Sequence, residues 1–341
     1  MPSLESLRIV FMGTPEFAVA SLDALVKAGC NIVGVITAPD KPGGRGMQLQ
    51  QSAIKKYAVE NNLHVLQPEK LKNPEFLAEL KSLEADLQVV VAFRMLPEVV
   101  WKMPPMGSVN LHGSLLPQYR GAAPINWAVI NGEKETGVTT FKLKQEIDTG
   151  DILLQEKFPI GDNETVGEVH DRMMAIGAGA LVKTVQGLAD GTLKEVPQES
   201  MVNKSIANGE WSNDEALKEM GEAFEPSTLN LKPQTLHHAP KIFAETCQLD
   251  FTKTVDEVFN LIRGLSPYPA AYTFLQGKKL KVYRVDKVNR VPSISPGDFE
   301  TDGKTFLQFA CADGYINVLD LQLEGKKRME VEDFLRGYRF G

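Results

Sequence analysis

The stretch that decides the fold is residues 8–37, RIVFMGTPEFAVASLDALVKAGCNIVGVIT. A short apolar run ends at Gly13, apolar residues then recur at helical spacing over residues 15–26, and a second apolar run covers residues 31–37. Thr14 and Pro15 suit an N-cap and a first helical turn. A strand, a helix and a strand in this order predict a right-handed unit with parallel strands, the unit of a doubly wound α/β domain.

The same alternation continues outward from this unit. The run at residues 86–93, DLQVVVAF, is the most apolar and predicts the centre of the sheet. Gly13 has no second and third glycine at the dinucleotide-binding spacing, and GxxxxGK does not occur, so binding of a nicotinamide or a nucleoside triphosphate is disfavoured. Helices are expected over residues 52–60, 74–83, 125–130 and 165–188, and strands over 64–66, 137–143 and 151–159. Residues 106–108 lead into a further short apolar strand.

A dense motif occupies residues 108–127, SVNLHGSLLPQYRGAAPINW, with a companion, EIDTGD, at 146–151. Alternation along the expected strand places Asn110 and His112 on one face, next to a turn at Gly113. The loop that carries Asp148 joins two expected strands and is therefore predicted to fold back toward this strand end.

These side chains suit acyl transfer to an amine. Neutral His112 accepts a proton near pH 7 and, once protonated, donates to a developing oxyanion, and the Asn110 amide donates to the same oxygen. Asp148 would orient the imidazole or relay a proton from the amine. Taken singly, a histidine in a strand is more often structural and an asparagine at a strand end more often forms a turn. The surrounding Leu-Leu-Pro turn, Arg120-Gly121 and Pro124 shift the balance toward function.

The order of fixed residues resembles that of the formyltransferases that use 10-formyltetrahydrofolate. The similarity is strongest to the members that formylate initiator Met-tRNA. It rests on Asn110-x-His112-x-Ser114-Leu115-Leu116-Pro117-x-x-Arg120-Gly121-x-x-Pro124, on TGVT at 136–139 and DTGD at 148–151, on MGTPEFA at 12–18 and PDKPGGRG at 39–46, and on IRGLSPYP at 262–269.

This resemblance implies formyl transfer to the α-amino group of methionine on initiator Met-tRNA, with 10-formyltetrahydrofolate as the donor and no metal. It assigns catalysis to Asn110, His112 and Asp148, and the folate site to Ser114, Leu115, Leu116 and Pro117. It implies that the loop at residues 39–51 reaches the acceptor end of the tRNA through Lys41 and Arg45, although Met47-Gln48 stands where a basic pair is common.

Composition and cysteine content fit this interpretation. The chain has 341 residues, 43% hydrophobic and 24% charged, which is ordinary for a soluble globular protein with two domains. Its three cysteines are far apart and form no CxxC pair, so neither a disulfide framework nor a thiolate metal site is indicated. His237-His238 has no partner at metal-ligand spacing. We expect a cytoplasmic monomer that does not bind membranes.

The domain organisation follows from changes in composition. We expect a catalytic domain at residues 1–190, an acidic linker at 191–241 with a small helix at 213–224, and a C-terminal domain at 242–341. Residues 263–290 carry seven Lys or Arg against one acid. A helix at 254–261 and short strands at 271–275, 279–286, 306–310 and 315–323 predict a small antiparallel barrel. By resemblance this barrel is OB-like and binds tRNA, with Lys279 and Lys281 as candidate contacts.

Two alternatives stay open. A formyltransferase that acts on a small amine, or a formyltetrahydrofolate hydrolase, shares the Asn-His-Asp core. The loop at 39–51 and the basic C-terminal domain favour a macromolecular substrate instead. A non-catalytic folate-binding or RNA-binding protein on the same scaffold is disfavoured by the intact Asn110, His112 and Asp148.

Overall fold

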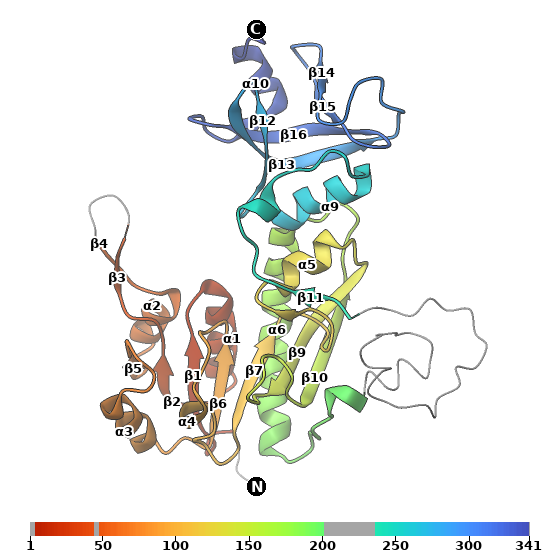
Figure 1. The fold of residues 1–341 in the computed structure, drawn as a ribbon. Coiled ribbons are helices and arrows are strands. Elements are labelled where there is room, and N and C mark those ends of the chain that lie inside the picture. The colour runs from red at the N-terminus through yellow and green to blue at the C-terminus, as the bar shows by residue number, and fades with distance from the viewer. Residues whose placement is uncertain (1–3, 44–47, 201–235, 341) are drawn as a thin grey trace, which may run out of the picture. The chain divides into compact units, whose positions relative to one another are not determined.

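The computed structural model describes residues 4–43, 48–200 and 236–340 and divides into two compact units (Figure 1). The first unit comprises Met1–Arg120, Gly137–Lys157 and Arg172–His238. The second comprises Gly121–Thr136, Phe158–Asp171 and Ala239–Gly341. The expected small helix at 213–224 lies outside the described residues.

A seven-stranded sheet, in the order β10-β9-β7-β6-β1-β2-β5, organises the described part of the first unit. Strand β1 lies between β2 and β6, and β6 pairs with β7, all in parallel, whereas β9 runs antiparallel to β7. All five residues of β6 are buried, as its apolar run predicts for a central strand. The strands are β1 (Arg8–Gly13), β2 (Asn31–Ile36), β5 (Val65–Leu66), β6 (Leu87–Val91), β7 (Ser108–His112), β9 (Glu135–Lys142) and β10 (Ile152–Pro159).

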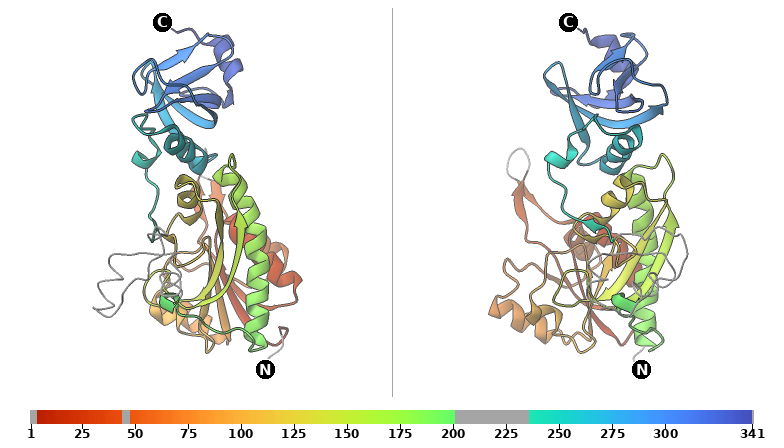
Figure 2. Two further views of the ribbon diagram at one scale, coloured as in Figure 1. Left: turned by 90° about the vertical axis from the view of Figure 1, so that its right-hand side faces the viewer. Right: turned by 45° about the vertical axis from the view of Figure 1, so that its right-hand side comes forward.

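Helices connect and cover these strands. Along α6, a Cβ atom on Gly177 would lie 3.0 Å from Leu111 of β7, which shows how closely this long helix packs on the sheet (Figure 2). The helices up to this point of the chain are α1 (Glu16–Lys27), α2 (Ala53–Glu60), α3 (Pro74–Ser82), α4 (Glu98–Trp101), α5 (Pro124–Ile130) and α6 (Val166–Ala189). The parallel α/β arrangement predicted from residues 8–37 is confirmed.

One detail of that prediction is wrong. Helix α1 begins at Glu16, so its N-cap is Pro15, and no side chain caps it. Thr14 lies one residue too early to accept from the first helical N–H groups. The Pro15 carbonyl accepts from the Ala18 N–H at 3.0 Å, so the backbone satisfies one of the donors that a side-chain cap would serve.

The Pro/Gly-rich stretch at 39–51 contains an antiparallel hairpin, where the sequence suggests only a surface loop. Strand β3 (Lys41–Gly43) pairs with β4 (Gln48–Gln50), and residues 44–47 between them lie outside the described part of the chain. A second short pairing joins β8 (Arg120–Gly121) to β11 (His238–Ala239). A Cβ atom on Gly121, whose φ is +129°, would lie 2.4 Å from the Ala239 carbonyl oxygen, so only glycine permits this approach.

The second unit contains a curled antiparallel sheet in the order β12-β13-β16-β15-β14, with β17 on β16. Register shifts along β13, between Val282 and Val285, bend this strand where it pairs with β16. The strands β12 and β16 have the predicted bounds. The elements are η1 (Glu245–Cys247), α9 (Val255–Leu265), β12 (Ala271–Leu275), β13 (Lys278–Val288), β14 (Phe299–Thr301), β15 (Leu307–Ala310), β16 (Tyr315–Leu323), β17 (Met329–Glu330) and α10 (Val331–Gly337).

The concave side of this sheet encloses the core of the second unit. Helix α9 begins with a complete capping box between Thr254 and Glu257, and its apolar face contributes Phe259 and Ile262 to the core. Phe309 and Tyr315 from the sheet are fully buried. Burying one such side chain stabilises a fold by about 1.5–3 kcal/mol, so this unit has a substantial core of its own.

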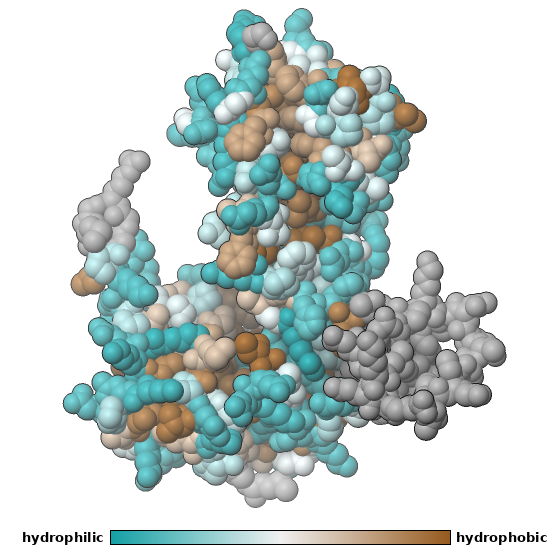
Figure 3. Space-filling model, in the orientation of Figure 1, coloured by the Kyte–Doolittle hydropathy of each residue, from teal (hydrophilic) through white to brown (hydrophobic). Residues whose placement is uncertain are grey.

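The face of the molecule shown in Figure 3 carries many hydrophilic side chains, with apolar side chains in separate patches. Met95 is 74% exposed and Tyr268 is 82% exposed. Within the described ranges, no helix combines the length and apolar character needed to cross a membrane.

Candidate active site

The candidate catalytic strand, β7, ends at His112 between two neighbours. Asn110 pairs with Val90 of β6 and Phe141 of β9, and His112 pairs with Thr139 of β9. The Asn110 side chain is half-buried, and it makes no hydrogen bond to any residue that the structure describes. His112 is 6% exposed. The strand end predicted from alternation is confirmed, and it holds a buried imidazole beside an amide that retains its donors.

A backbone carbonyl fixes the imidazole. Nε2 of His112 lies 2.9 Å from the Tyr119 oxygen. Since a carbonyl oxygen only accepts, Nε2 carries the hydrogen, and Nδ1 of the neutral ring is left as an acceptor. Tyr119 has a left-handed backbone with φ of 60°. The sequence pattern assigned no role to this residue.

Residues after the linker hold Tyr119 in that conformation. The Tyr119 N–H donates to the His237 oxygen at 2.7 Å, and the two rings stack with centroids 5.5 Å apart. The His237 N–H in turn donates to Oε1 of Gln118 at 2.8 Å. His237 therefore supports the peptide group that orients His112.

Asp148 faces the other ring nitrogen. Its Oδ2 lies 3.7 Å from Nδ1 of His112, and the two side chains are 11% and 7% exposed. The predicted return of this loop to the end of β7 is confirmed. Because 3.7 Å exceeds a direct hydrogen bond, the Nδ1 edge retains its capacity to bind a reacting group. The pair therefore combines a partly buried carboxylate with an imidazole nitrogen that can accept a proton.

The Asp148 loop has an unusual backbone. Asp148 itself has a left-handed φ of 56°. Two residues later, a Cβ atom on Gly150 would lie 1.5 Å from the Lys142 carbonyl oxygen, so no other residue fits there without moving the loop. The Gln198 amide nitrogen donates to the Asp148 oxygen at 2.9 Å and to the Gly150 oxygen at 2.8 Å. Sequence reasoning placed Gln198 in the linker and missed this role, since no local pattern signals a contact across fifty residues.

Arg120 belongs to the same cluster. Its Nε and Nη2 donate to Oε1 of Gln198 at 3.1 and 2.6 Å. Burial lowers the pKa of the Arg120 guanidinium, and the negative charges of Glu199, Asp148 and Glu146 oppose that shift. A charged guanidinium thus lies in the electric field of the Asp148 carboxylate.

The loop assigned to the folate is fastened by hydrogen bonds. The Leu116 N–H donates to the Thr139 hydroxyl at 3.0 Å, and Gln155 donates to the Leu116 oxygen at 2.8 Å. The Ser114 hydroxyl donates to the Gln118 oxygen at 2.6 Å. Ser114, Leu116 and Pro117 are buried, whereas Leu115 is half-buried. The loop therefore presents mainly its backbone and Leu115 to its surroundings.

The two tRNA candidates of the first unit differ in what the structure describes. Lys41 is exposed at the start of β3 and pairs through its backbone with Gln50. Arg45 lies outside the described residues.

In the second unit, Lys279 and Lys281 lie two residues apart on β13, so they share one face of the sheet. They pair with Phe274 and Tyr272 of β12, and Nζ of Lys279 lies 3.5 Å from the centre of the Tyr272 ring. Phe274 is 52% exposed. The lysines therefore share this face with two aromatic rings, a combination that sequence reasoning did not anticipate for β12.

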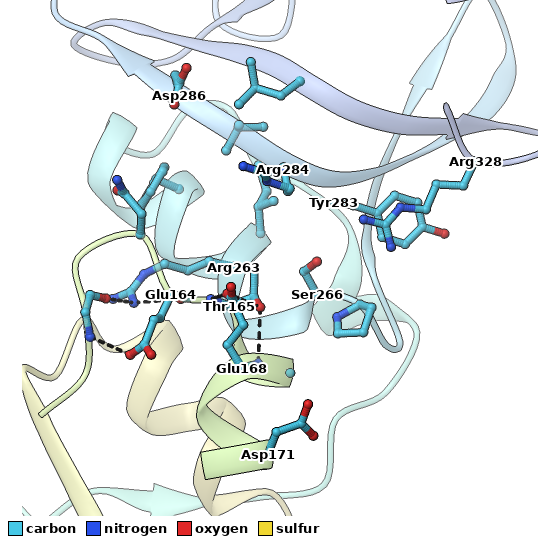
Figure 4. A pocket seen from close by; sticks show the side chains of 18 residues that line it. Glu164, Thr165, Glu168, Asp171, Arg263, Ser266, Tyr283, Arg284, Asp286 and Arg328 are labelled. Carbon is cyan, nitrogen blue, oxygen red and sulfur yellow. Dashed lines mark hydrogen bonds between the residues drawn. The ribbon is translucent and has the colours of Figure 1, made fainter. Parts of the chain in front are cut away.

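A pocket of about 710 Å³ lies within the second unit. Figure 4 shows Tyr283 and Arg284 of β13, with Arg328 just before β17, to one side of the pocket. Glu164 and Thr165, which precede α6, and Glu168 and Asp171 of its first turns lie on the other side. Arg263 projects between them, donating to the Glu164 oxygen at 3.2 Å, and burial lowers its pKa. Charges of both signs line the pocket. Neither Lys279 nor Lys281 lines it.

The described part of the chain contains no cluster of three or more His, Cys, Asp or Glu side chains placed to hold a metal ion.

A mixed α/β unit with an Asn, His and Asp at one strand end, followed by an antiparallel unit, defines a class of acyl-transferring enzymes. The chain belongs to the formyl transferase family: the model of that family matches residues 7–185, and the model of its C-terminal domain matches residues 241–339.

The similarity to known proteins extends over nearly the whole chain. The chain is 54% identical to "Methionyl-tRNA formyltransferase" of Phocaeicola vulgatus, over 98% of this chain and 97% of that protein. It is 52% identical to the protein of the same name from Parabacteroides distasonis, over 98% and 97%. A solved N-formyltransferase from Helicobacter canadensis, in complex with folinic acid and dTDP-3-aminofucose, shares its fold, with a TM-score of 0.63, 20% identity and coverage of 95% and 100%.

Proposed function

We propose that this chain is a methionyl-tRNA formyltransferase. It transfers the formyl group of 10-formyltetrahydrofolate to the α-amino group of methionine on initiator Met-tRNA. The observation that carries the proposal is the pair of buried His112 and partly buried Asp148, with Nδ1 and Oδ2 3.7 Å apart. The chain that holds this pair aligns along its length with relatives of that name.

The site residues have distinct tasks in this reaction. Nδ1 of His112 takes a proton from the attacking amine, because Nε2 is committed to the Tyr119 carbonyl. The protonated ring and the Asn110 amide then donate to the oxyanion of the tetrahedral intermediate. Asp148 stabilises the imidazolium across 3.7 Å. The imidazolium then returns its proton from Nδ1 to the folate nitrogen, the bond between this nitrogen and the formyl carbon breaks, and the oxyanion becomes the carbonyl of the formylated amine. No covalent intermediate with the enzyme is required.

The folate donor fits the loop of Ser114, Leu115, Leu116 and Pro117 next to these groups. Since Thr139 and Gln155 hold the backbone at Leu116, the loop is rigid before substrate arrives. In our proposal it shapes the pocket through its backbone and Leu115. The reactive carbon is supplied by the folate, and the residues of the chain orient it.

The tRNA is bound by basic residues in both parts of the chain. We assign contacts to Lys41 and Arg45 in the first, and to Lys279 and Lys281 beside Tyr272 in the second. Cations interleaved with aromatic rings suit a phosphate backbone with stacked bases. The domains are residues 1–190, a linker at 191–241 and an OB-like barrel at 242–341. We propose a monomer that acts in the cytoplasm.

The proposal is tested by transfer of labelled formyl from 10-formyltetrahydrofolate. Charged initiator Met-tRNA, charged elongator Met-tRNA and free methionine are compared at equal concentrations. We expect transfer to initiator Met-tRNA and little to the other two. Transfer to small amines alone would contradict the proposal and indicate a small-molecule formyltransferase, and release of formate without transfer would indicate a hydrolase.

The role of His112 is tested by His112→Ala. Loss of a general base lowers turnover by about 10²–10⁴-fold. We expect this loss in kcat with an unchanged Kd for tRNA, measured by filter binding. His64→Ala is the control, since His64 is exposed and paired with Glu79. Equal losses of turnover and tRNA affinity would contradict the assignment.

A further inference from the structure

Gln198 is a buried polar side chain that the reaction scheme above does not use. It is fully buried, at 0% exposure, although it follows α6 in the acidic stretch. Its Oε1 accepts from Arg120, and its Nε2 donates to the oxygens of Asp148 and Gly150. A buried amide with both of its polar atoms satisfied in this way is rigidly oriented.

A backbone pairing between Val196 and Ile152 positions Gln198 next to the Asp148 loop. The Val196 N–H donates to the Ile152 oxygen at 2.9 Å, and the Ile152 N–H donates to the Val196 oxygen at 2.8 Å. Ile152 begins β10, directly after the Asp148 loop. The chain after α6 therefore returns to the strand next to the site, and Gln198 enters two residues later.

Gln198 contacts the backbone of the loop that orients the Asp148 side chain. Asp148 has a left-handed φ of 56°, a conformation that an L-residue adopts at some cost in free energy. The hydrogen bond to the Asp148 oxygen fixes the peptide group that follows this residue. It thereby helps to hold the backbone from which the carboxylate reaches 3.7 Å from Nδ1 of His112. The same amide anchors the Arg120 guanidinium, whose charge interacts with Asp148.

We propose that Gln198 is a positioning residue for formyl transfer, holding the Asp148 loop and Arg120 in one fixed arrangement. The inference rests on the proposed function. The positioning role differs from a packing role because the oxygen and the nitrogen of the Gln198 amide bind different partners. The oxygen serves Arg120, and the nitrogen serves the loop carbonyls.

Two substitutions separate these halves. Gln198→Ala removes both sets of contacts. Gln198→Glu keeps an acceptor for Arg120 but places oxygens against the Asp148 and Gly150 carbonyls, so it removes only the loop contacts. Ser200→Ala is the matched control in the same segment, since its hydroxyl donates to the Pro197 oxygen and touches neither partner.

The readout is the split between kcat and KM, measured below the melting temperature of each variant. Misplacing a catalytic group by about 1 Å can cost on the order of 10²-fold in rate. We expect both Gln198 variants to lose kcat by about that factor, with KM for tRNA and folate within about threefold of wild type. Ser200→Ala retains full kcat. A kcat of Gln198→Glu equal to that of the wild type would overturn the proposal. So would a loss of kcat in either variant that is no larger than its unfolded fraction explains.

A second measurement is independent of the proposed function. Hydrogen exchange of the peptide covering residues 144–151 reports the loop directly, and it should quicken in both Gln198 variants and stay unchanged in Ser200→Ala. If the wild-type protein shows no formyl transfer, the proposed function is refuted. The exchange measurement would still report whether Gln198 fixes the loop. Unchanged exchange in an active protein would refute the positioning role alone.

Discussion

At the scale of single residues, the site depends on backbone conformations that few side chains allow. Asp148 and Tyr119 both have left-handed φ angles, and each lies next to one nitrogen of His112. Gly150 permits the Asp148 loop to pass against the Lys142 carbonyl. The chemistry therefore depends on main-chain geometry as much as on the identity of the reacting groups.

Gly150→Ala tests this dependence. The added Cβ atom would lie 1.5 Å from the Lys142 oxygen, so the loop must move and carry Asp148 away from His112. We expect kcat to fall on the order of 10²-fold. Steady-state formylation measures it, with Gly179→Ala as the control, since Gly179 is exposed on α6 with nothing within 4 Å of an added Cβ. Activity equal to wild type in Gly150→Ala would show that the loop tolerates displacement.

At the scale of elements, strands β14, β15 and β16 are joined by one carboxylate. Glu300 of β14 forms an ion pair with Arg290 and accepts from Gln308 of β15 at 2.7 Å and from Tyr315 of β16 at 3.0 Å. The hydrogen bond from Arg290 leads the contacts that lower the pKa of Glu300 from its ordinary 4.5 to about 2. This carboxylate is therefore a pH-dependent link between neighbouring strands.

The direction of the pH effect follows from that lowered pKa. The contribution of Glu300 to stability is complete above about pH 4.5 and is lost as the pH falls toward 2. In Glu300→Gln, the free energy of unfolding should thus decline less steeply over this range than in the wild type. Urea unfolding at pH 6, 4 and 3 measures it, and Glu245→Gln, an exposed carboxylate of the same unit, is the control. Parallel pH profiles for Glu300→Gln and wild type would contradict the prediction.

At the scale of the whole molecule, buried free thiols occur in both units, one in the first and two in the second. Cys30 is 8% exposed in the first unit, and Cys247 and Cys311 are 4% and 1% exposed in the second. Burial raises the pKa of each, that of Cys311 to about 12. A protonated, shielded thiol reacts slowly with thiol reagents, so the cysteines report when each unit opens.

The cysteines of the native protein should therefore not react with Ellman's reagent at pH 8. All three cysteines should react once denaturant unfolds the protein. Mass mapping of the labelled peptides at intermediate denaturant shows which unit opens first. A cysteine that reacts in the native protein on mixing would contradict the burial of that thiol.

The limits of sequence reasoning are visible in this same molecule. Alternation placed Asn110 and His112 on one face of a strand, and the strands on either side of Asp148 implied that its loop folds back. Both inferences need only a local pattern. Gln198 and His237 could not be found this way. Their contacts join residues that lie 78 and 119 apart in the chain, and no periodicity encodes such pairings.

The acceptor that fixes His112 is a main-chain carbonyl, which all twenty amino acids possess. A codon change at position 119 can remove the phenol ring but never the oxygen that Nε2 of His112 contacts. Variation at this codon can therefore alter how firmly the peptide is held, through the stacking with His237, without erasing the contact itself. Because the orienting group belongs to the main chain, the site depends at position 119 on the backbone conformation, with φ of 60°, and not on the chemistry of the side chain.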